Sequence, residues 1–68
     1  MTVEANADMI EGYMDGYDLT APEPSANRSH SYRHSFLIGR AEKMKLPLPT
    51  YQELERRAEM AIRADAQA

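Results

Sequence analysis

Four prolines in two closely spaced pairs limit what this chain can fold into. Pro22 and Pro24 form the first pair, and Pro47 and Pro49 form the second. Proline lacks a backbone N–H and disfavours a helical conformation at the residue before it, so neither pair can lie within a continuous helix. The two pairs therefore divide the chain of 68 residues into three segments.

Each of the three segments has the apolar spacing of a helix, with apolar residues three and four positions apart, and no alternating strand pattern competes. We predict an all-α, three-helix domain over residues 1–68, with helices at about 3–17, 28–44 and 51–65. Three polar residues are candidate N-caps of the second helix: Ser25, Asn27 and Ser29. Thr50 and Glu53 form a capping box at the start of the third. We expect the last residues, 64–68, to fray.

Three glycines lie within the predicted helices, where each costs about 1 kcal/mol relative to alanine. Gly12 and Gly16 are four residues apart and share one side of the first helix, and Gly39 is in the second. We expect them to let the first two helices pack with their backbones close together. The first helix also has an apolar face made of Met9, Ile10, Tyr13, Met14 and Tyr17. The third is amphipathic, with Tyr51, Leu54, Ala58, Ala61 and Ile62 on its apolar face.

The short length predicts marginal stability. A chain of this size buries only about 60% of its unfolded surface, and the absence of cysteine excludes disulfides and thiolate metal sites. A bound partner, a homo-oligomer or very good helix packing must then supply stability. The N-terminus does not resemble a signal peptide, and no stretch approaches the roughly 18 apolar residues of a membrane span. We therefore expect a cytoplasmic protein with no membrane contact and no cofactor.

Charge is unevenly distributed along the chain, although the net charge is only −3. Residues 1–24 carry six acidic and no basic residues, whereas residues 25–45 carry five basic residues and one acidic one. Four cations of the second segment are candidate contacts to nucleic acid or to a partner: Arg28, Arg33, Arg40 and Lys43. Four acids of the first segment are the alternative partner-binding set: Asp8, Glu11, Asp15 and Asp18. A third interpretation is that the two segments attract each other within the fold.

His30 and His34 are four residues apart and could share one helix face, as in some metal sites. The strong form of this motif has glutamate directly after the first histidine, whereas this chain has Ser31 there. Serine and histidine are mixed in the same stretch, but so small a helical chain has little room for a pocket that excludes water. We predict neither a metal site nor an enzyme.

The sequence "GYMDG" at residues 12–16, followed by "FLIG" at residues 36–39, resembles the ribosome modulation factor family. The matching positions are Gly12, Tyr13, Gly16, Phe36, Leu37 and Gly39, and the resemblance extends from Gly12 to Met44. It implies a non-catalytic two-helix unit that binds ribosomal RNA and proteins. The chain departs from the family in three ways: it is acidic whereas family members are strongly basic, it has Phe36 in place of the family's typical tryptophan and Arg40 in place of a later aromatic residue, and it has a third helix.

Together these observations predict a non-enzymatic binding protein of a bacterium or bacteriophage. The first expectation is docking on a ribonucleoprotein such as the ribosome, with Arg28, Arg33, Arg40 and Lys43 contacting phosphate. The alternative is a phage-encoded inhibitor of a bacterial protein machine, for example an anti-defence protein of the anti-CRISPR type. In that case the acidic residues or an exposed apolar helix face would occupy the partner's site.

Overall fold

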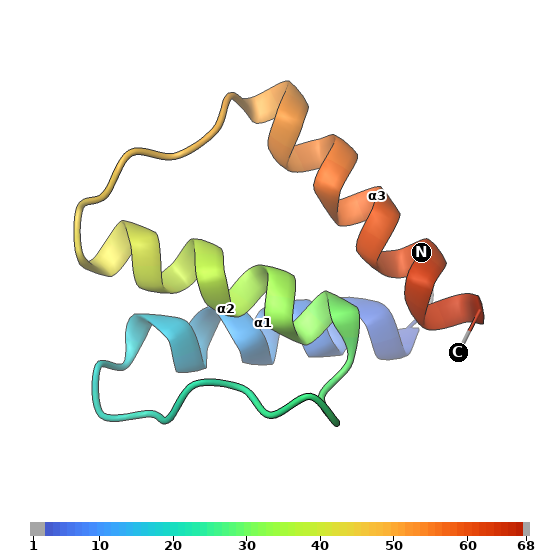
Figure 1. The fold of residues 1–68 in the computed structure, drawn as a ribbon, viewed down its shortest axis with the longest axis horizontal. Coiled ribbons are helices and arrows are strands. Elements are labelled where there is room, and N and C mark those ends of the chain that lie inside the picture. The colour runs from blue at the N-terminus through green and yellow to red at the C-terminus, as the bar shows by residue number, and fades with distance from the viewer. Residues whose placement is uncertain (1–2, 68) are drawn as a thin grey trace.

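The computed structural model describes residues 3–67, and the side chains of residues 5–67. These residues form three helices, α1 (Val3–Tyr17), α2 (His30–Lys43) and α3 (Tyr51–Gln67), shown in Figure 1. The predicted all-α fold is confirmed. The second helix is slightly shorter than predicted at both ends, and the third is two residues longer.

The first two helices run side by side in the same direction. Residues 18–29 return along the pair from the end of α1 to the start of α2 (Figure 1). After α2, residues 44–50 lead away from it, and α3 runs back at an angle (Figure 1). The C-terminal end of α3 meets the N-terminal end of α2, whereas the other ends of these two helices diverge (Figure 1).

The contact between α1 and α2 is made at glycines on both helices. A methyl group on Gly12 would overlap the carbonyl oxygen of Tyr32 and lie 3.0 Å from its carbonyl carbon. The same substitution at Gly16 would overlap the carbonyl oxygen of Phe36. Gly39 on α2 lies equally close to the backbone of Tyr13 on α1. These neighbours are backbone atoms, which cannot move aside as side-chain ends do.

The apolar face of α1 is not the side that packs against α2. The packed side consists of Ala5, Gly12 and Gly16, all of them buried. Ile10 and Met14 remain 56% and 65% exposed. Small residues therefore define the contact side of α1, and Ile10 and Met14 point elsewhere.

The start of α2 is capped from two directions. Ser29 is its N-cap, and the Ser29 hydroxyl accepts a hydrogen bond from the Tyr32 backbone N–H at 3.0 Å. The Asp65 carboxylate of α3 accepts from the backbone N–H groups of His30 at 2.6 Å and Ser31 at 3.0 Å. It also accepts from the Ser31 hydroxyl at 2.5 Å. Residues 64–67, which the sequence predicts to fray, continue α3, and the Asp65 contact lies at this end of the helix; Ala68 lies outside the described residues.

The interior is small. Among residues 5–67, the buried apolar side chains are Ala5, Tyr32, Phe36 and Ala61. Tyr32 and Phe36, one turn apart on α2, supply the two large ones, and their ring centroids are 6.2 Å apart. The α2 helix is therefore the centre of the molecule, with α1 and α3 on different sides of it.

Candidate functional site

Two of the predicted nucleic-acid contacts, Arg28 and Arg40, are engaged within the fold. Arg28 forms an ion pair with Glu11 at 3.1 Å, and its guanidinium lies 3.6 Å from the centroid of the Tyr32 ring. Arg40 Nε donates to the Gly16 carbonyl at 2.7 Å, and one Nη donates to the carbonyls of Asp18 and Ala21, each at 3.2 Å.

Arg40 thereby satisfies carbonyls at the C-terminal end of α1. The last carbonyls of a helix lack partners within it, and the negative end of the helix dipole favours a cation there. The last turn of α1 contains no basic residue of its own, so α2 supplies the cation. The position of Arg40 is explained by this role in holding α1, α2 and the connection together.

The other two predicted cations are in different environments. Arg33 is partly buried, with one Nη 3.2 Å from Nδ1 of His30. Its Nε is buried and has no hydrogen-bond partner among the described residues. Lys43 is exposed at the end of α2, with its ammonium 5.1 Å from the centroid of the Tyr17 ring. Arg28 and Arg33 line one hollow, and Arg33 and Arg40 line another, so neighbouring cations of this set adjoin each other, although Arg28 and Arg40 are already engaged within the fold.

The acidic set is engaged in the same way. Asp8 accepts a hydrogen bond from the Ser29 hydroxyl at 2.7 Å, and Asp15 accepts one from the Tyr32 hydroxyl at 2.6 Å. The bond to Asp15, together with burial, raises the pKa of Tyr32. Asp18 accepts from the Thr20 hydroxyl at 2.7 Å and from its backbone N–H at 3.0 Å. These bonds lower the pKa of Asp18, which stays ionised at neutral pH.

The opposite charges of the two segments thus meet within the molecule. Glu11 pairs with Arg28, and Asp8 and Asp15 bind polar groups of the Ser29–Tyr32 turn. These contacts lie along the α1–α2 contact at Gly12, Gly16 and Gly39, which we call the glycine interface, and they fix the register of the two helices. These contacts agree with the third interpretation of the charge distribution, in which the two segments attract each other within the fold.

The two histidines point into different surroundings. The ring of His30 is beside Arg33, and His34 lies in the groove between α2 and α3. Burial, assisted by the nearby positive charge of Arg57, lowers the pKa of His34. Within the described part of the chain, no three histidine, cysteine or carboxylate side chains gather as metal ligands would.

A hollow of about 540 Å³ lies where the start of α1, the start of α2 and the end of α3 meet. Its charged lining includes Arg28 and Arg33 but also Asp8 and Asp65. Both signs are present, and the two carboxylates already accept hydrogen bonds from the chain itself. This hollow therefore lacks the single sign of charge that an anion or cation site requires.

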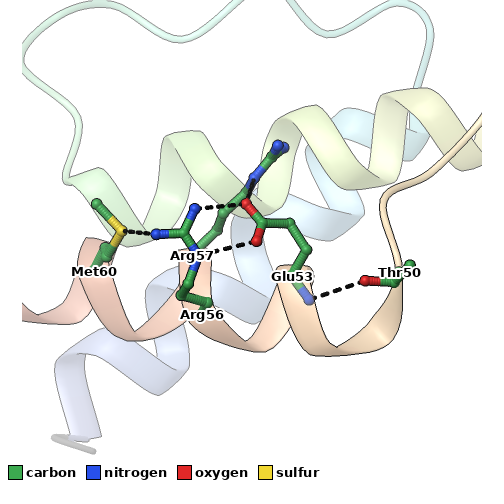
Figure 2. Close-up of polar contacts among 5 residues, drawn as sticks. All are labelled: Thr50, Glu53, Arg56, Arg57 and Met60. Carbon is green, nitrogen blue, oxygen red and sulfur yellow. Dashed lines mark hydrogen bonds and ion pairs between the residues drawn. The ribbon is translucent and has the colours of Figure 1, made fainter.

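The start of α3 carries a compact charged network (Figure 2). The Glu53 backbone N–H donates to the Thr50 hydroxyl at 3.2 Å, as the capping box predicts. The Glu53 carboxylate binds Arg56 at 2.7 Å and Arg57 at 3.0 Å (Figure 2), and these contacts lower the pKa of Glu53 to about 2. The network lies on the exposed surface and stabilises the first turns of α3.

Four large side chains of α1 remain on the surface, and we call them the α1 face. They are Ile10, Tyr13, Met14 and Tyr17, with exposed fractions of 56%, 38%, 65% and 46%. The last turn of α2 supports one edge: Tyr13 donates a hydrogen bond to Glu42, and the Lys43 ammonium lies beside the Tyr17 ring. The rings of Tyr13 and Tyr17 stack with centroids 6.1 Å apart. The α1 face is therefore exposed and has a defined shape.

The apolar spacing of the sequence identifies the residues of the α1 face, but it does not show whether they are buried or exposed. The residues of the α1 face were identified as one side of a helix, and nothing in the spacing indicated that this side faces outward. Asp65 was missed altogether, because a carboxylate near a chain end gives no sign of a contact 34 residues away.

No protein family, curated protein or solved structure that was compared with the chain gave a significant match. None of the helices formed by residues 3–67 has both the length and the apolar character needed to cross a lipid bilayer.

Proposed function

We propose that this chain is a non-enzymatic binding protein that docks on another protein through the α1 face. The observation that carries the proposal is the placement of Ile10, Tyr13, Met14 and Tyr17 on the surface while glycines pack against α2. Their spacing of i, i+3, i+4 and i+7 is the pattern by which an amphipathic helix anchors in a partner's groove. The glycine interface holds α1 in place, so less conformational entropy is lost on binding.

The charges beside the α1 face indicate the chemistry of the partner. Glu11 and Asp18 follow Ile10 and Tyr17 directly in sequence, so they flank this face, and both are exposed. Arg28 pairs with Glu11, and the Lys43 ammonium lies beside the Tyr17 ring, so the negative charge beside this face is partly offset. The matching surface is an apolar groove with a basic rim, because opposite charges steer association and exclude wrong partners.

Such docking fits an inhibitor of a bacterial protein machine, acting in the cytoplasm by occupying a groove that the machine needs. A phage-encoded anti-defence protein is the form of this function that we favour. A groove rimmed by basic residues is also typical of proteins that handle nucleic acid. The acidic flank of α1 would then compete with the natural ligand of that groove.

The second candidate is ribosome-modulation-factor-like docking on a ribonucleoprotein. The specific observation in its favour is that Gly12, Gly16 and Gly39, three of the positions on which the resemblance rests, are all at the α1–α2 interface. Against it, Arg28 and Arg40 are engaged within the fold. Of the predicted phosphate contacts, Lys43 remains exposed, and its ammonium lies beside the Tyr17 ring.

Affinity capture from a lysate of the bacterial host tests the proposal. The tagged chain is compared with Met14→Glu and with Met60→Glu as a matched control. Both methionines are more than half exposed, at 65% and 54%, but Met60 is on α3. We expect Met14→Glu to weaken capture at least about tenfold, because a carboxylate would be buried in an apolar groove. Met60→Glu should capture the partner as the wild type does.

Nuclease treatment separates the two candidates. A protein that remains bound after nuclease, and whose capture depends on Met14, supports the first. The ribonucleoprotein candidate replaces the first if nuclease abolishes capture and capture falls steeply with salt. In that case capture should depend on Lys43 but not on Met14. Capture by Met14→Glu equal to the wild type refutes docking through the α1 face.

A further inference from the structure

The molecule exposes more surface than a compact monomer of its size. Its accessible surface is 5022 Å² for a mass of 7.7 kDa. A typical folded monomer of this mass exposes about 4,300 Å². Its radius of gyration of 11.4 Å is likewise larger than the roughly 10.9 Å expected for this length. The excess surface is about 700 Å², close to the roughly 800 Å² that each partner buries in a standard protein–protein interface.

Away from the contact at Asp65, α2 and α3 diverge (Figure 1). A groove of about 260 Å³ lies between these helices and is lined mainly by apolar side chains, among them Leu37, Ile38, Leu48 and Leu54. Leu37 is 68% exposed and Leu48 39%. In the adjoining connection, Met44 and Leu46 are 55% and 52% exposed. On this side of α2, large apolar side chains gather as in a hydrophobic core, but the cluster is open to solvent on one side.

The charge at this groove is nearly balanced, unlike that beside the α1 face. Arg57 lines the groove, but it is paired with Glu53 at 3.0 Å. His34, the other titratable group in the lining, is kept neutral at pH 7 by a lowered pKa. Lys45, in the adjoining connection, is exposed and does not line the groove. The groove itself therefore selects neither a basic nor an acidic partner. A surface that is apolar and nearly neutral can pair with an identical copy without like-charge repulsion.

We propose that the α2–α3 groove and residues 44–50 form the interface of a homodimer. Leu37 and Leu48 of each copy lie against the groove of the other across a two-fold axis. The pairing adds large apolar side chains to a core whose large members are Tyr32 and Phe36. The α1 face, on another side of α2, remains accessible. The proposal therefore does not depend on the function proposed above.

Sedimentation velocity tests the dimer directly. The wild type is measured from low micromolar to several hundred micromolar, and we expect a species of twice the 7.7 kDa chain mass that dissociates only on dilution. Leu37→Glu and Leu48→Glu should each raise the dissociation constant at least about tenfold, because both place charge in the interface. Met14→Glu, on the α1 face, should remain dimeric.

Circular dichroism of each variant verifies that the helices are retained. Leu37 is mostly exposed, and Leu48 lies outside the helices, so we expect both substitutions to leave the three helices in place. Three results would overturn the proposal: a wild type that stays monomeric at the highest concentration, assembly that continues beyond the dimer, or a dimer that both leucine variants leave intact.

Discussion

Gly12 and Gly39 show how single residues set the distance between α1 and α2. Each lies against the backbone of a residue on the other helix, Tyr32 and Tyr13 respectively. Helix propensity favours alanine over glycine by about 1 kcal/mol, so the cost of these glycines within each helix is offset by the tertiary contact. The hydrogen bonds of Asp15 to Tyr32 and of Arg40 to Gly16 depend on this short separation.

Replacing Gly12 by alanine should therefore destabilise the protein. Overpacking of an interior typically costs about 1–3 kcal/mol, and the upper end applies here because the obstructing atoms are backbone. Subtracting the propensity gain leaves a net loss of about 2 kcal/mol in the free energy of unfolding. Urea denaturation measures this loss. Ala7→Gly, at an exposed position of α1, is the control for propensity alone and should cost about 1 kcal/mol. A Gly12→Ala protein as stable as the wild type would show that the helices are further apart.

At the scale of elements, α3 is held mainly at one end. Asp65 binds the first turn of α2, Ala61 is buried nearby, and the start of α3 diverges towards residues 44–50. Burial opposes the ionised form of Asp65, but the hydrogen bonds from Ser31 and His30 outweigh it and keep the pKa of this carboxyl below its ordinary value. The contact is therefore fully formed at neutral pH.

Removing the Asp65 carboxylate should release α3 from α2. Asp65→Ala leaves two backbone N–H groups and the buried Ser31 hydroxyl without their acceptor, which costs about 1–3 kcal/mol. We expect amide hydrogen exchange in α3 to accelerate while exchange in α1 and the middle of α2 changes little. Glu55→Ala, which removes an exposed carboxylate of α3, should leave all three helices unaffected. Uniform acceleration in Asp65→Ala would instead mean that the three helices unfold as one unit.

His34 should make the α2–α3 contact sensitive to pH. Its pKa is below the ordinary 6.5, because of burial and Arg57, so the folded state binds fewer protons than the unfolded state. The free energy of unfolding should then fall as the pH drops through 6.5 and level off below the folded-state pKa. Urea midpoints at pH 8 and pH 5.5 measure the difference, which His34→Gln should reduce. A midpoint that rises on acidification would contradict the position of His34.

The sequence predicted the elements better than their contacts. Proline pairs and apolar spacing located three helices, and the Thr50–Glu53 box located the start of α3, because these signals act within one turn. Which side of α1 packs against α2 depends on backbone clearance at Gly12 and Gly16, which apolar periodicity does not measure. The pairing of Glu11 with Arg28 depends on the two helices running in the same direction, which neither segment encodes by itself.

The whole molecule is a pair of helices in close contact with a third attached at one end. Contacts such as the Glu11–Arg28 ion pair align α1 and α2, and two separate surfaces expose several apolar side chains each, the α1 face and the α2–α3 groove. If the groove pairs with a second copy, each dimer presents two copies of the α1 face. Two linked faces bind a repeated or dimeric partner more tightly than one, because the second contact is intramolecular.

Photo-crosslinking in the bacterial host tests the central claim most directly. A photoreactive amino acid is placed at Met14 on the α1 face or at Met60 on α3, and the products are separated after irradiation. We predict a discrete adduct with a host protein from position 14 and none of that size from position 60. An adduct with nucleic acid from position 14, or the same protein adduct from position 60 alone, would contradict docking through the α1 face.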